Sequence, residues 1–201
     1  MPRWLGPLCV ALTCYGLYNV WTERSLRQPP GILAPNEPIQ RTLTATTGPF
    51  ARAGWMMMPL AEFTVEARVL ARERYRWDAT ASLAPIDLAL GWGPLSDSAL
   101  LKGLSFDQHT RFLHWRMNDS AISPATLVAH TANMHMIPAD AAIKHALIAA
   151  RPGQIARFSG YLVSATKPGA GGEWRSSLSR TDAGAGACEI VWVTAFAASN
   201  R

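Results

Sequence analysis

The sequence predicts an α+β domain: a strongly bent antiparallel sheet or small open β-barrel with one main packed helix, preceded by an N-terminal transmembrane anchor. Three observations predict this class. Apolar and polar residues alternate from Phe63 to Trp77, the pattern of a strand with one buried face. Residues 138–150 carry an apolar helical stripe. An uncharged run from Trp4 to Trp21 is close to the shortest segment that crosses a bilayer.

These runs divide the chain into three parts. Residues 1–22 are the expected anchor, residues 23–47 a proline-rich tether, and residues 48–197 a single β-rich domain. No small-x-small cleavage site follows the apolar run, so we expect the anchor to be retained. The expected location is a bacterial inner membrane, crossed once, with the C-terminal domain in the periplasm. An inverted topology and a buried hairpin are the alternatives.

The alternating run of residues 63–77 would be roughly 50 Å long at about 3.3 Å per residue, too long for a small domain. We therefore expect a bulge or bend near residues 71–73. Even-numbered positions of this run place four arginines on one strand face, here called the arginine ladder: Arg68, Arg72, Arg74 and Arg76. A solvated strand face is one interpretation of the ladder, and recognition of anionic groups by planar guanidinium groups is the other.

The other elements follow in chain order. A short strand is expected within residues 84–95, and a short helix at residues 97–102. Further strands are expected at residues 110–117, 127–137, 154–165 and 189–196. The main helix is expected to begin at Pro138, which suits a first turn, and to end before Pro152 and Gly153.

Charge and cysteine content exclude several classes. The formal net charge of +5 is mildly basic, well short of a nucleic-acid-binding tail. Cys9 and Cys14 fall in the apolar N-terminal run, which leaves Cys188 alone in the domain. The domain therefore cannot form an internal disulfide, and it carries no cysteine-rich metal spacing.

The histidine spacing does not indicate a metal site. His109 and His114 are five residues apart, as are His130 and His135. This offset places neither pair on one face of a helix or a strand, so neither forms a local chelate. We expect no metal ion and no cofactor.

The polar loop of residues 174–188 is the expected functional site, because loops on a rigid scaffold carry most binding and catalytic groups. A nucleophilic Cys188 would need a base or a cation beside it, and otherwise it is a structural thiol. The candidate catalytic residues are Cys188, Ser177, His135 and Asp182. The candidate ligand-binding residues are the arginine ladder with Asn133, Arg175, Ser176, Arg180 and Glu189.

Four segments carry a resemblance: GWGPLSD at 91–97, ANMHMIPAD at 132–140, SGYLV at 159–163 and WRSSLSRTDAGAGACE at 174–189. Together they are similar to an uncharacterised family of bacterial membrane-anchored proteins, over about residues 50–195. The resemblance implies an anchored single-domain protein and brings no established activity with it.

Because no catalytic motif is recognisable, the sequence favours a non-enzymatic binding or assembly module of the bacterial envelope. It would engage an anionic ligand or a protein partner through the arginine ladder and the 174–188 loop. One alternative is an envelope hydrolase or transferase that uses Cys188 or a loop serine with a histidine. Another is an OB-like barrel that binds nucleic acid, which is disfavoured because aromatic residues and arginines alternate faces. A histidine within reach of Cys188 in a cleft would favour the enzyme.

Overall fold

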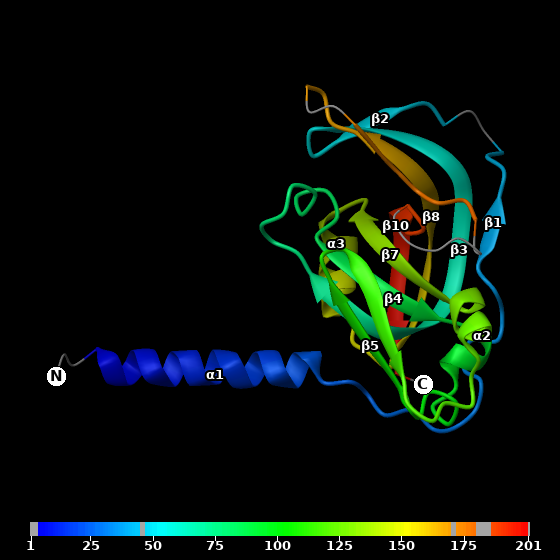
Figure 1. The fold of residues 1–201 in the computed structure, drawn as a ribbon. Helices are drawn as coiled ribbons and strands as arrows, with labels where there is room; N and C mark the ends of the chain where they lie inside the picture. Colours follow the sequence, from blue (N-terminus) through cyan, green and yellow to red (C-terminus); the bar gives the residue numbers. More distant parts are fainter. Residues whose placement is uncertain (1–3, 45–46, 170–171, 180–185, 201) are drawn as a thin grey trace.

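The computed structural model describes residues 4–44, 47–169, 172–179 and 186–200. The chain folds into an α+β unit that is mostly β-sheet (Figure 1). Five strands form its centre: β3 (Trp55–Arg74), β4 (Ile86–Gly91), β7 (Thr131–Pro138), β8 (Ile155–Thr166) and β10 (Glu189–Ser199). They are hydrogen-bonded in the order β3-β4-β7-β10-β8, and β8 pairs in turn with β3. The bent sheet therefore closes on itself as a barrel.

Strand β3 makes this closure possible because it is long and interrupted twice. Its residues 56–68 pair with β8, and its residues 68–74 pair with β4. The register shifts between Pro59 and Ala61, and again between Val69 and Ala71. Bulges of this kind bend a strand and increase its twist. The second shift lies just before the bend expected at residues 71–73.

All five strands contribute to one apolar cluster, which is therefore the barrel interior. On β4 the inward residues are Ile86, Leu88 and Leu90, and on β7 they are Met134 and Met136. The period of two along a strand places the residues between them on the outer face. The pairs in the barrel are antiparallel except for β7 with β10, which run parallel.

Helix α3 (Ala141–Ala149) packs Leu147 into the barrel core. The predicted helix began at Pro138, which is wrong, because Pro138 is the last residue of β7. Asp140 is the N-cap residue instead, and its side chain accepts a hydrogen bond from the backbone N–H of Ile143 at 2.8 Å.

Smaller elements surround the barrel. Strands β5 (Leu104–His109) and β6 (Phe112–Met117) form a hairpin where only a strand at 110–117 was predicted. Helix α2 (Pro124–Ala129) occupies the beginning of the strand predicted at 127–137. The other short elements are β1 (Ile39–Arg41), β2 (Phe50–Arg52), β9 (Glu173–Arg175) and the 3₁₀ turn η1 (Gly93–Ser96).

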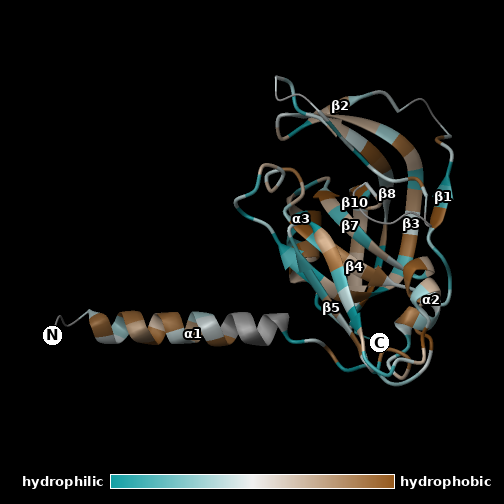
Figure 2. Ribbon diagram, in the orientation of Figure 1, coloured by the Kyte–Doolittle hydropathy of each residue, from teal (hydrophilic) through white to brown (hydrophobic). Residues whose placement is uncertain are grey.

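The N-terminal segment contains helix α1 (Leu5–Glu23), which projects away from the barrel (Figures 1 and 2). Among the described residues, no helix combines the length and the mean hydropathy that crossing a membrane requires. The predicted transmembrane anchor therefore receives no support from the structure. Within the predicted tether of residues 23–47, Leu33 and Ala34 are buried and strand β1 pairs with β3.

Candidate active site

Polar side chains replace apolar ones on the outer face of β4 and β7. Asp87 lies between the inward residues Ile86 and Leu88, and it is directly opposite His135 in the antiparallel pair of strands. Asn133 precedes His135 by two residues and therefore shares its face. The parallel pairing of β7 with β10 begins at Glu189, so Cys188 enters this site at the adjoining end of β10. Three strands thus bring four polar side chains together.

Asp87 and His135 form a buried pair, and Cys188 acts on the same imidazole. The carboxylate of Asp87 is fully buried, and its Oδ2 lies 2.9 Å from Nδ1 of His135. The two atoms are not aligned as in an ideal hydrogen bond, so their contact is chiefly ionic. Cys188 also acts on this imidazole, because it is one of the groups that raise the pKa of His135. The arrangement corresponds to a nucleophile, a base and a group that orients the base.

The electrostatics of His135 favour its charged form. Burial lowers the pKa of His135, but the interactions of this ring with Asp87 and Cys188 outweigh burial and raise this pKa to about 9. At neutral pH the ring is therefore an imidazolium. A nucleophilic cysteine needs such a cation or base beside it.

Asn133 holds a donor against the sulfur. Its Nδ2 lies 3.4 Å from Sγ of Cys188, and the same group donates to the carbonyl oxygen of Arg111 at 2.9 Å. Its Oδ1 accepts a hydrogen bond from Gln108, which fixes the direction of the amide. The Asn133 N–H groups can therefore stabilise negative charge on the sulfur or on a nearby oxygen.

Arg111 connects the β5–β6 hairpin to the buried carboxylate. One guanidinium nitrogen lies 2.7 Å from Asp87 Oδ1, and another lies 2.9 Å from Asp78. Thr110 and Arg111 form the two-residue turn with φ of 51° and 70°, a conformation that usually requires Asn or Gly. A strained turn built from bulky residues is typical of a functional site, and here the contacts of Arg111 hold it in place.

Aromatic rings complete the surroundings of Arg111 and His135. The guanidinium carbon of Arg111 lies 3.6 Å from the centre of the Tyr75 ring, and the Tyr75 hydroxyl accepts from the Arg111 backbone N–H. Burial raises the pKa of Tyr75 to about 12, so this hydroxyl stays protonated. The Trp174 ring lies 4.9 Å from the His135 ring. These rings exclude water from the imidazole, which strengthens its charge interactions.

Cys188 and Asn133 line a pocket of about 250 Å³. Its other walls include the aromatic residues Trp92, Phe112 and Trp115. Cys188 is partly exposed, whereas His135 behind it is only 3% exposed. A partly exposed thiol with a buried charged partner is the microenvironment expected of a reactive cysteine.

The structure brings together four of the predicted site residues: Cys188, His135, Asn133 and Glu189, which also lines the pocket. Ser177 lies nearby, but its hydroxyl bonds the backbone of Ser179. Ser176 is buried, donates to the Ser177 carbonyl and accepts from the N–H of Ile190. The hydroxyls of both serines are therefore bonded to the backbone and hold the loop in its conformation. Arg175 is exposed beside Glu173. Asp182 and Arg180 lie outside the described residues.

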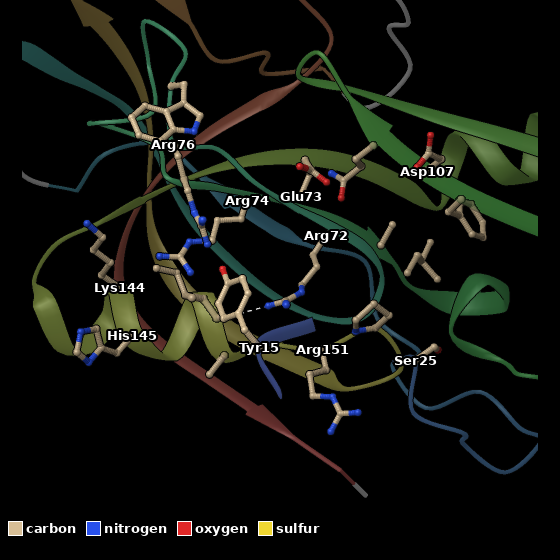
Figure 3. Close-up of a pocket in the computed structure, with 18 residues that line it drawn as sticks. Tyr15, Ser25, Arg72, Glu73, Arg74, Arg76, Asp107, Lys144, His145 and Arg151 are labelled. Atoms are coloured by element: carbon tan, nitrogen blue, oxygen red, sulfur yellow. Dashed lines mark hydrogen bonds between the residues drawn. The ribbon is translucent and has the colours of Figure 1, made fainter. Parts of the chain in front are cut away.

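The arginine ladder is not one face, because the bulge at residues 69–71 separates its members. Arg68 lies on the outer face, is buried, and donates to the carbonyl of Ser96 and the hydroxyl of Ser98. Arg72 lies on the opposite face and donates to two carbonyls at the end of α3. Arg72, Arg74 and Arg76 line a separate groove (Figure 3).

Sequence reasoning missed Asp87, Arg111 and Tyr75. Asp87 is the one charge in the otherwise apolar run APIDLALGWG, which is a signal that could have indicated a buried ionic site. Arg111 offered no comparable signal, because the hairpin that delivers it was not predicted.

Among the described residues, no group of three or more histidine, cysteine, aspartate or glutamate side chains is arranged to hold a metal ion. The hairpin places His109 and His114 face to face, with ring centres 3.8 Å apart. The spacing was expected to keep this pair off a shared face of a strand or a helix, and the hairpin brings the two rings together because the chain reverses direction between them.

No protein-family model, curated protein or solved structure matches the chain.

Proposed function

We propose that the protein is a cysteine-dependent acyl-transfer enzyme, a hydrolase or a transferase, with Cys188 as nucleophile. The observation that supports this most is the setting of Cys188 at the wall of a pocket. Its sulfur lies 3.4 Å from Nδ2 of Asn133, and it raises the pKa of His135, which is paired with Asp87. A structural cysteine packs among aliphatic side chains as a small hydrophobe. Cys188 instead meets an imidazolium and an amide N–H donor.

In the first half-reaction, the thiolate of Cys188 attacks the carbonyl carbon of an ester, thioester or amide. The N–H group of Asn133 donates to the negative charge that develops, on the sulfur or on the carbonyl oxygen. His135 gives its proton to the leaving group, whose bond to the carbonyl carbon breaks as an acyl thioester forms on Cys188. Asp87 keeps the ring oriented and compensates its charge.

In the second half-reaction, neutral His135 removes a proton from water or from another acceptor. The acceptor oxygen or nitrogen attacks the thioester, the thiolate leaves, and His135 is again protonated. Water as acceptor makes the enzyme a hydrolase, and a second substrate makes it a transferase. Trp92, Phe112 and Trp115 in the pocket wall favour an acyl group with an apolar or aromatic portion.

The test is hydrolysis of p-nitrophenyl esters with acyl chains of graded length. We expect Cys188→Ala to abolish the wild-type rate, and His135→Gln to lower it by at least 100-fold, because nucleophile and base act as a unit. A Cys9→Ala/Cys14→Ala variant is the matched control, since both thiols lie on α1 away from the pocket. It should keep full activity.

Two results would end this proposal. One is hydrolysis that survives in the correctly folded Cys188→Ala protein. The other is the absence of turnover with every ester and thioester tried, together with no acyl adduct on Cys188 by intact-protein mass spectrometry.

The hypotheses of a binding module and of a nucleic-acid-binding barrel are each supported by fewer observations than the enzyme. A groove lined by arginines supports anion binding and is taken up below. A closed barrel of five strands is compatible with OB-like nucleic-acid binding. On β4 and β7, however, the outer face carries Asp87, Asn133 and His135 and has no row of aromatic stacking residues, which favours the enzyme. The envelope location stays a prediction from the sequence.

A further inference from the structure

A basic groove of about 1320 Å³ lies between the end of β3 and helix α3, apart from the Cys188 pocket (Figure 3). Its cationic side chains are Arg72, Arg74, Arg76, Lys144 and Arg151, and its acidic ones are Glu73 and Asp107. The cations thus outnumber the acids. Arg74, Arg76 and Lys144 are exposed, and none of them forms an ion pair with another described residue.

Helix α1 adjoins this groove, since Tyr15 and Ser25 line it together with the basic residues. The described part of α1 exposes large apolar side chains, among them Val10 at 63%, Leu12 at 61% and Leu17 at 66%. Trp77, also on the groove wall, is 93% exposed. An apolar helix, an exposed tryptophan and a cluster of cations therefore meet at one place.

We propose that the basic groove and α1 together form the docking surface for an anionic phospholipid bilayer, with lipid phosphates entering the groove. A soluble phosphate compound could fill the groove, but it would leave the apolar side chains of α1 in water. A bilayer accommodates both features, because apolar side chains enter the acyl boundary while arginine and lysine bind anionic headgroups. Trp77 suits the headgroup level, where tryptophan is favoured.

This inference does not depend on the enzymatic proposal, because it uses none of the Cys188 pocket residues. Its test is co-sedimentation of the full chain with vesicles of phosphatidylcholine alone and of phosphatidylcholine with phosphatidylglycerol. We expect binding that requires the anionic lipid and falls as salt rises. The variant Arg74→Gln/Arg76→Gln/Lys144→Gln should weaken that binding about 100-fold, since each cation contributes roughly a fivefold factor.

The matched control removes the same charge elsewhere: Arg41→Gln/Lys102→Gln/Arg116→Gln, at exposed positions outside the groove. It should bind within about threefold of wild type, and both variants should keep the wild-type circular dichroism spectrum. Equal loss in the control, or equal binding to both vesicle types, would overturn the proposal. Displacement from the vesicles by millimolar inorganic phosphate at constant ionic strength would overturn it too, by assigning the groove to a soluble phosphate.

Discussion

At the scale of single residues, the site depends on a buried charge. Asp87 has no exposed surface, and removing a carboxylate from water costs several kcal/mol unless cations compensate it. Arg111 contacts one carboxylate oxygen and His135 the other. Stability and catalysis are therefore linked, because the group that compensates Asp87 is also the proposed general acid.

This link predicts a pH dependence of stability. The pKa of His135 is raised from 6.5 to about 9 in the folded protein, so protonation of His135 stabilises the fold fully below pH 6.5. That contribution, roughly 3 kcal/mol at most, is lost as the pH rises through 9. Urea unfolding of wild type and of His135→Gln at pH 6 and pH 9.5 measures it. Wild type should lose more free energy of unfolding, and an identical loss in both proteins would assign the effect to other groups.

At the scale of elements, the β5–β6 hairpin acts as a support for the site. Its turn places Arg111 on Asp87, and the Arg111 carbonyl receives the Asn133 amide. The two non-glycine residues with positive φ are retained at a cost of about 1–2 kcal/mol each. Such a cost is sustained only where other contacts compensate it.

Replacing the hairpin cation tests this role. Arg111→Gln should lower the free energy of unfolding by about 3 kcal/mol or more, because it leaves a buried carboxylate with one cation fewer. Arg116→Gln removes an exposed charge from the same hairpin and should change stability by less than about 0.5 kcal/mol. Urea denaturation followed by fluorescence compares the two. Equal effects would show that Arg111 is an ordinary surface residue.

At the scale of the whole molecule, the sequence predicted the α+β class and the bent strand, because alternation along residues 63–77 is a local signal. It could not predict closure, which depends on β3 pairing with β8 about a hundred residues later. The prediction that the arginine ladder shares one strand face failed for a related reason, since one bulge moves Arg72 to the opposite face from Arg68. The register of a strand depends on contacts with distant segments, which the local sequence pattern does not contain.

The residues of the candidate site also fall into those that the sequence indicated and those that only the fold revealed. His135, Asn133, Cys188 and Glu189 stood out as polar residues near strands, and the fold brings them together. Asp87 was overlooked although it is the one charge in an apolar run, and Arg111 was overlooked because its hairpin was not predicted. Each sequence signal identified a residue, and the pairing of β4, β7 and β10 supplied the chemistry.

The central claim is that His135 activates Cys188, and alkylation kinetics test it most directly. In a Cys9→Ala/Cys14→Ala background Cys188 is the only thiol, so iodoacetamide consumption reports on it alone. An unperturbed thiol at pH 6.5 is about 1% thiolate. The account predicts alkylation of folded protein at least tenfold faster than of the same chain unfolded in urea, and loss of that advantage in His135→Gln. A folded rate no faster than the unfolded rate, or one unchanged by His135→Gln, would contradict the account.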